Sequence, residues 1–329
     1  MKKQLTLKRN CTARWGIAAL MAASAPAFAQ GTPPDAGQTL HELQSQPAAP
    51  GTHNATNLMV PADADTVADS GMAFPVKKVQ VEGNIAVSSD ELTPLVAPLE
   101  GKKVTLGELR QAAARITARY REHGYVVARA FVPAQEIRDG VVRIAVLEGK
   151  LASTSFINNS VIGTPTLEAI SAAQNLNGKT IHSAECDREL LLMADLPGAG
   201  PVSGTLKPGQ EVGTSDMVVK VDPGKSHEGQ VSIDNYGNRY TGQIRTNANV
   251  DFNSPLKIGD KLSLRATATN EHLLYGQVSY DLPANSDGWR VGGYLSSNSY
   301  ELGKEFDSLD ASGRSNTTGL YTSDPLLRG

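Results

Sequence analysis

Residues 243–252, QIRTNANVDF, alternate strictly between polar side chains and side chains that are apolar or small. Side chains along a β-strand point to opposite faces with a period of two, so this stretch predicts a strand with one polar and one apolar face. The same alternation recurs at residues 262–268 and 274–282. Amphipathic strands of about ten residues, repeated and joined by turns, are typical of a transmembrane β-barrel. No run of roughly 18 apolar residues, the length of a spanning helix, competes with this interpretation.

A targeting segment is predicted at the N-terminus. Five basic residues within residues 2–14 precede an apolar run at residues 15–25. The sequence AFA at residues 27–29 then supplies a small-x-small cleavage signal. Residues 1–29 are therefore predicted to be a signal peptide. Removing these five positive charges changes the formal net charge from −3 to −8, which argues against nucleic acid as a partner. Export also leaves Cys186 as the single cysteine, so folding is expected to rest on packing without an internal disulfide.

The segment after the cleavage signal has the composition of a linker. Residues 30–73 are rich in Pro, Ala, Thr, Asp and Gly, and they contain five acidic residues but no Lys or Arg. This composition predicts a flexible acidic linker. The exception is residues 35–46, DAGQTLHELQSQ, which can form a few helical turns before a Pro-rich stretch.

Residues 74–151 predict a compact α+β domain with the element order β-α-α-β-β. Thr105 and Glu108 have the spacing of a capping box at the start of its second helix, whose apolar residues recur at helical spacing. Strands at residues 126–132 and 141–147 are expected to close this first domain.

The remainder of the chain predicts a second domain and then the amphipathic strands. Residues 152–224 repeat the β-α-α-β-β order loosely, with a closing strand at residues 202–206. Residues 225–329 hold about five or six amphipathic strands by the alternation test. Within them, residues 301–315 are polar and predict a loop, and residues 318–327 predict a last strand.

Patterns typical of catalysis or metal binding are absent from the sequence. The six histidines are scattered, and there is no HExxH, GxSxG or CxxC. His182 and Cys186 stand four residues apart, but two ligands do not make a zinc site, and burial is the commoner state of a free cysteine. Residues 198–204, GAGPVSG, follow a helix and precede a strand, the reverse of the order in a dinucleotide-binding loop. The sequence therefore indicates neither an enzyme nor a cofactor site.

Backbone at the edge of a small sheet is the remaining candidate for a binding site. An extended guest peptide can pair with the free N–H and C=O groups of an edge strand, with little dependence on its sequence. Residues 202–206 are one candidate edge, although such a strand can also simply close its domain core. The other candidate edge consists of Val126, Val127, Ala128, Arg129, Ala130, Phe131 and Val132.

Three stretches resemble the outer-membrane transporters of two-partner secretion, the haemolysin secretion/activation family (TpsB proteins of the ShlB/FhaC/HecB type). Residues 124–135, GYVVARAFVPAQ, and residues 139–150, DGVVRIAVLEGK, are similar to the closing half of that family's first POTRA domain. Residues 233–242, IDNYGNRYTG, resemble its first barrel strand and turn. The resemblance implies an α+β fold of two tandem POTRA domains, followed by the first strands of a sixteen-stranded antiparallel transmembrane β-barrel.

The same resemblance implies a function that needs no cofactor. POTRA domains would capture an unfolded secreted β-helical protein, an adhesin or haemolysin, in the periplasm, and a barrel in the cell outer membrane would export it. Since an N-terminal helix plugs the pore in some family members, residues 35–46, with Leu40 and Leu43 on one face, are the candidate plug. We expect a monomer that contacts the exported protein and outer-membrane lipid but no nucleic acid. The side chains expected to face the lumen are Arg245, Asn247, Asn249 and Asp251.

Two alternatives stay open at this point. One is a barrel-assembly factor of the BamA type, which residues 139–150 and the composition of the linker disfavour. The other is a soluble periplasmic adaptor with two peptide-binding domains, in which residues 244–252 would expose an apolar face. Because five or six strands leave unpaired backbone in lipid at several kcal/mol per group, the chain is expected to be a fragment of a longer transporter or a truncated product.

Overall fold

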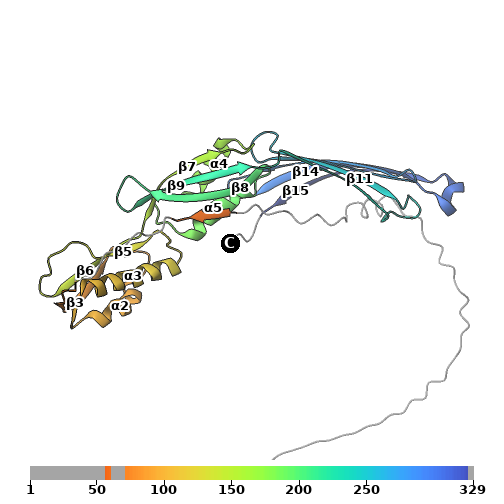
Figure 1. Ribbon diagram of the computed structural model, residues 1–329. Coiled ribbons are helices and arrows are strands. Elements are labelled where there is room, and N and C mark those ends of the chain that lie inside the picture. The colour runs from red at the N-terminus through yellow and green to blue at the C-terminus, as the bar shows by residue number, and fades with distance from the viewer. Residues whose placement is uncertain (1–55, 61–70, 325–329) are drawn as a thin grey trace, which may run out of the picture.

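The structure, a computed structural model, describes residues 56–60 and 71–324. They form a row of three parts, with a first α/β domain at one end, a second α/β domain in the middle and a long antiparallel sheet at the other end (Figure 1). The predicted signal peptide (residues 1–29) and the candidate plug helix with Leu40 and Leu43 lie outside the described residues. Of the helices that the structure describes, none is long and apolar enough to cross a bilayer.

The first α/β domain packs helices against a sheet with strand order β3-β6-β5, and β2 pairs with β4 beside it. Its elements are β2 (Phe74–Val76), β3 (Lys78–Glu82), α2 (Ser89–Val96), the 3₁₀ helix η1 (Ala97–Leu99), β4 (Lys102–Val104), α3 (Leu106–Glu122), β5 (Arg129–Phe131) and β6 (Val141–Leu147). Thr105 and Glu108 form the predicted capping box of α3. The apolar stripe of this helix, with Leu109, Ile116 and Tyr120, is fully buried in the domain core.

The predicted strand at residues 126–132 is wrong over its first part. Val126 and Val127 lie in a turn, in which the Ala128 N–H donates to the Tyr125 carbonyl oxygen at 3.1 Å, and β5 covers only Arg129–Phe131. Both valines pack against the core of the second domain instead. Their β-branched side chains favour a strand locally, but contact with a neighbouring domain overrides that preference.

The second α/β domain has a four-stranded sheet with the order β1-β8-β9-β7, and its helices share one core with that sheet. The elements that follow the first domain are β7 (Lys150–Asn158), α4 (Thr164–Gln174), α5 (Ser183–Ala194), β8 (Ala199–Pro208) and β9 (Thr214–Pro223). β9 runs antiparallel to β8 and parallel to β7. The sheet therefore has β7 at one edge and β1 at the other.

Strand β1 (Thr56–Met59) comes from the predicted linker. It runs parallel to β8, with Thr56 opposite Val202 and Leu58 opposite Gly204. Figure 1 shows β1 as the orange arrow beside α5. The prediction of a flexible linker over residues 30–73 is wrong at these four residues, because pairing with a distant strand leaves no trace in local composition.

The C-terminal sheet is an antiparallel meander with the order β10-β11-β12-β13-β14-β15. Its strands are β10 (His227–Asp234), β11 (Arg245–Asn253), β12 (Lys261–Thr269), β13 (Leu274–Pro283), β14 (Arg290–Glu301) and β15 (Ser312–Ser323). The predicted loop at residues 301–315 is too long, because β14 continues to Glu301, the 3₁₀ helix η2 (Lys304–Leu309) turns the chain, and β15 begins at Ser312. In the part of the chain that the structure describes, the sheet is open, with β10 and β15 at its edges.

Candidate functional site

One edge of the second domain is completed by a segment from far away in the sequence. β8 pairs with β9 on one side and with β1 on the other. Gly204 leaves a notch in this edge, since a Cβ there would stand 3.0 Å from Leu190 Cδ1 and 3.3 Å from Leu58 Cδ1. Leu58 lies over the notch and packs against the domain core, whereas Asn57 and Met59 are exposed. The edge thus binds an extended segment through its backbone and one apolar side chain.

Side chains of the first domain already pair with the backbone at both edges of its sheet. At β5, the Ala130 N–H donates a 2.9 Å hydrogen bond to Thr117 Oγ1 of α3. At β3, the Val79 N–H donates a 2.9 Å hydrogen bond to Glu100 Oε1. A backbone donor that has a partner within its own domain offers little to a guest strand.

The seven residues of the candidate edge at 126–132 do not form one continuous edge. Five of the seven side chains are buried or packed against a domain core, namely those of Val126, Val127, Ala128, Ala130 and Val132. Arg129 and Phe131 are half-buried on β5, which is an edge strand but only three residues long. The structure therefore leaves only β5 of this candidate at a sheet edge.

His182 lies where the two α/β domains meet. Its Nδ1 accepts a 3.3 Å hydrogen bond from the Ala184 N–H and so caps α5, and its ring packs edge-on against Tyr125 with 5.2 Å between centroids. Cys186 is buried one turn later, and burial raises the pKa of its thiol to about 12. No cluster of three metal-ligating side chains occurs within residues 56–60 and 71–324. In this arrangement His182 and Cys186 stabilise the fold.

The polar face of the C-terminal sheet carries linked polar contacts at the β10–β12 strands. Arg245 Nε donates to Asp234 Oδ1 at 2.7 Å, and Asn247 Nδ2 donates to the other oxygen of the same carboxylate at 2.8 Å. The Thr267 hydroxyl then donates to Asn247 Oδ1 at 2.9 Å. Cross-strand contacts of this kind hold polar side chains in place on a sheet surface.

The other two residues expected to face a lumen lie on the same face of β11. Asp251 forms an ion pair with Lys261 of β12, with 2.9 Å between Oδ2 and Nζ. Asn249 lies opposite Gln230 of β10 and Arg265 of β12 in the strand register. The structure therefore brings the four residues of the candidate set together on one polar face.

The opposite face of this sheet exposes large apolar side chains. Val231 and Ile233 of β10 are each 72% exposed, and Leu320 of β15 is 87% exposed. Leu264 and Leu295, on the strands between, face the same way and are also exposed. Contiguous exposed apolar surface of this kind marks contact with lipid or protein.

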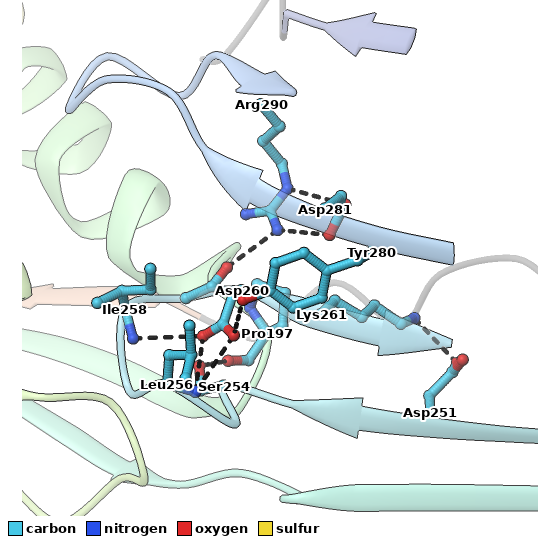
Figure 2. A network of polar contacts seen from close by, with 11 residues as sticks. Pro197, Asp251, Ser254, Leu256, Ile258, Asp260, Lys261, Tyr280, Asp281 and Arg290 are labelled. Atoms are coloured by element: carbon cyan, nitrogen blue, oxygen red, sulfur yellow. Dashed lines mark hydrogen bonds and ion pairs between the residues drawn. The ribbon is translucent and has the colours of Figure 1, made fainter. Parts of the chain in front are cut away.

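The turn between β11 and β12 is organised by the buried carboxylate of Asp260 (Figure 2). The Tyr280 hydroxyl donates to this carboxylate at 2.6 Å and the Leu256 N–H donates to it at 3.2 Å. Arg290, from the start of β14, donates to the Gly259 carbonyl oxygen at 2.9 Å. These contacts link three neighbouring strands of the sheet at the end that faces the second domain.

Two hydrogen bonds to backbone carbonyl oxygens connect the same turn to the second domain. The Ser254 hydroxyl donates to the Pro197 carbonyl oxygen, and the Gly163 N–H donates to the Lys257 carbonyl oxygen at 2.7 Å. Pro and Gly predict a turn at residues 254–260 from the sequence alone. The docking role of the turn has no such signal, because its partners lie in the loops before α4 and after α5.

Comparison with known proteins supports this arrangement. The family model described as POTRA domain, ShlB-type, matches residues 74–149, and the model described as haemolysin secretion/activation protein ShlB/FhaC/HecB matches residues 213–329. Heme/hemopexin transporter protein HuxB of Haemophilus influenzae is 31% identical over 261 residues, which are 78% of this chain and 46% of HuxB. Outer membrane transporter CdiB of Escherichia coli O6:K15:H31 is 27% identical over 244 residues, which are 74% of this chain and 40% of CdiB. The chain spans about half the length of the curated relatives it matches.

Solved structures show the same fold. CdiB from Escherichia coli matches with a TM-score of 0.61 and 24% sequence identity, covering 81% of this chain and 50% of that chain. CdiB from Acinetobacter baumannii matches with a TM-score of 0.51 and 17% identity, covering 89% of this chain and 57% of that chain. POTRA-like α/β domains docked on an amphipathic antiparallel sheet define a class of outer-membrane transporters whose α/β domains lie in the periplasm. The chain belongs to the haemolysin secretion/activation family of the ShlB/FhaC/HecB type, whose relatives here are transporters and not enzymes.

Proposed function

We propose that this protein exports a secreted partner protein across the outer membrane, and that its α/β domains bind the partner as an unfolded chain in the periplasm. The observation that carries the proposal is the amphipathic sheet, which has a hydrogen-bonded polar face and an exposed apolar face. A sheet of this kind is suited to lie between lipid and water. It follows two α/β domains in a chain of a transporter family.

The two faces of the sheet have different surroundings in this proposal. Arg245, Asn247, Asn249 and Asp251 face an aqueous lumen, where their charges and amides stay hydrated or paired. Val231 and the other exposed apolar side chains contact the hydrocarbon of the outer membrane. The proposal is supported by the cost of the reverse arrangement, since charged side chains facing lipid near the middle of a bilayer cost about 2–4 kcal/mol for Arg or Lys.

The proposed partner is a large β-helical secreted protein that arrives as an extended polypeptide. Strand pairing recognises the backbone and therefore accepts many sequences. Two relatives are named heme/hemopexin transporter protein and hemolysin transporter protein, and these names support a transport role for this chain. The transport step itself requires no cofactor in this proposal.

Deletion of the gene in its native host, followed by mass spectrometry of the culture medium, tests the function. We expect one large protein to disappear from the medium and to be degraded or retained in the periplasm, and the intact gene to restore its secretion. An unchanged medium would contradict export. A general loss of outer-membrane barrel proteins would instead identify a barrel-assembly factor, and recovery of the protein in the soluble periplasmic fraction would identify an adaptor.

A further inference from the structure

The strand that covers the β8 edge is held by few contacts. β1 is four residues long. Leu58 is its one apolar side chain that faces the core, because Met59 is 50% exposed. A strand of this size buries little apolar area, so it can open without unfolding the domain beneath it.

At three other sheet edges of the α/β domains, backbone groups pair with parts of the same domain. Thr117 and Glu100 accept backbone hydrogen bonds from β5 and β3. At the β7 edge, the Leu151 N–H donates to the Lys179 carbonyl oxygen at 3.0 Å, and the Gly178 N–H donates to the Leu151 carbonyl oxygen at 2.7 Å. Among the edges that the structure describes in these two domains, β8 is the one that pairs with a strand preceding the first domain in the sequence.

We propose that Thr56–Met59 is an internal guest strand, which occupies the β8 edge in the resting protein and is displaced when an extended segment of the exported partner pairs with β8. This inference rests on the proposed function, since the exported partner supplies the displacing segment. Displacement exchanges one set of strand-pairing hydrogen bonds for another of the same kind, so the net cost in hydrogen bonding is small. The β8 edge is then both the binding site and the element that senses an arriving partner.

The occupied edge defines the chemistry of the displacing segment. The segment runs parallel to β8 and pairs with the backbone of residues 202–205. An apolar side chain stands opposite Gly204, where it fills the notch beside Leu190. The flanking side chains point outward, as those of Asn57 and Met59 do, and can be polar. Alternation of apolar and polar residues is the pattern of β-strands, so a β-rich partner contains many suitable segments.

A disulfide that locks β1 onto β8 tests the proposal. Asn57 and Ser203 lie directly opposite in the register, and the spacing of about 5 Å between neighbouring strands suits a disulfide between Asn57→Cys and Ser203→Cys. The probe is a fluorescent peptide of residues 54–61, NATNLMVP, added to the full-length protein in detergent. We expect the oxidised protein to bind the peptide at least about 10-fold more weakly than the reduced protein. The Asn57→Cys variant alone is the matched control and should show no such difference.

A second variant opens the edge. Leu58→Asp removes the apolar contact of β1 and leaves β8 unchanged. If the edge is open about 1–10% of the time in the native protein, full opening raises the apparent affinity for the peptide about 10–100-fold. Met59→Asp changes the exposed neighbour on the same strand and should leave the affinity at the native value.

The outcomes separate this inference from the proposed function. Equal peptide binding by the locked and reduced proteins, or an affinity of Leu58→Asp equal to the native value, would overturn the internal guest strand. Export of the native partner that continues with the lock intact would also overturn it, while leaving the transporter in place. If the lock blocks peptide binding but the secreted proteins do not depend on this protein, the exported partner is ruled out as the displacing chain.

Discussion

At the scale of single residues, one buried carboxyl has a marked effect on the second domain. Glu189 of α5 is 0% exposed. Its carboxylate has no close hydrogen-bond partner in the part of the chain that the structure describes. The Ser171 hydroxyl of α4 favours the charged form of this carboxylate, but less strongly than burial disfavours it. Burial raises the pKa of Glu189, because the charged form loses its hydration in the domain core.

Replacing Glu189 with Gln should change the pH dependence of stability. A carboxyl whose pKa is raised on folding stabilises the folded state most below its unfolded pKa, and this contribution is lost as the pH rises through the folded pKa. We therefore expect the stability of the native protein, relative to that of Glu189→Gln, to fall as the pH rises from mildly acidic to neutral. Thermal unfolding over this range measures the difference.

The matched control for this prediction is Glu185→Gln. Glu185 is exposed on the same helix, so its replacement should leave the pH profile of the native protein unchanged. Parallel pH profiles for the native protein and Glu189→Gln would show that Glu189 is not neutral in the folded state.

At the scale of elements, the alternation of polar and apolar residues predicts strands of the C-terminal sheet close to their observed positions. The stretch predicted at residues 243–252 is β11 (Arg245–Asn253). The lengths of β14 and β15 could not be predicted in the same way, because their polar ends are strands only through pairing with each other. Helix α3 could also be predicted, since its capping box and its apolar stripe both lie within its own stretch of sequence.

Two adjacent positions of β10 test the assignment of the faces. Val231→Arg places a charge on the exposed apolar face, and we expect it to reduce stability in lipid by about 2–4 kcal/mol and to lower the amount of protein in the outer membrane. Gln230→Arg places the same charge on the polar face, opposite Asn249, and should have little effect. Equilibrium unfolding from lipid vesicles and outer-membrane fractionation provide the measurements. Equal losses for both variants would argue against a lipid-facing apolar side.

At the scale of the whole molecule, the second domain is attached to the sheet through the turn around Asp260. This carboxylate orders the turn internally, and Ser254 and Lys257 of the same turn contact the loops on either side of the second domain's helices. The β8 edge therefore belongs to a domain that is fixed to the sheet. Figure 1 shows this domain between the first α/β domain and the C-terminal sheet.

Loss of the Asp260 carboxylate should loosen this attachment. Asp260→Ala leaves the Tyr280 hydroxyl and the Leu256 N–H without their acceptor, at a local cost of about 1–3 kcal/mol. Amide hydrogen exchange at residues 254–260 should then become about 10–100-fold faster. Asp251→Asn, which breaks the ion pair with Lys261 on the same strand pair without touching the turn, should leave exchange there unchanged. If amide exchange at residues 254–260 stays slow in Asp260→Ala, contacts other than those of the Asp260 carboxylate hold the turn against the second domain.

The class of this protein can be recognised from its amino-acid sequence, because the relevant signals are local. Strand alternation, helix caps and the motif at residues 139–150 each occupy a short, continuous stretch of the sequence. Which sheet edge holds an extended strand, in contrast, depends on long-range contacts in the folded protein. It places Thr56–Met59 on β8, pairs β5 with Thr117, and turns Val126 and Val127 toward the second domain. The physical reason is that these contacts join residues far apart in the chain, and backbone hydrogen bonding between distant segments leaves no period or composition by which to recognise it.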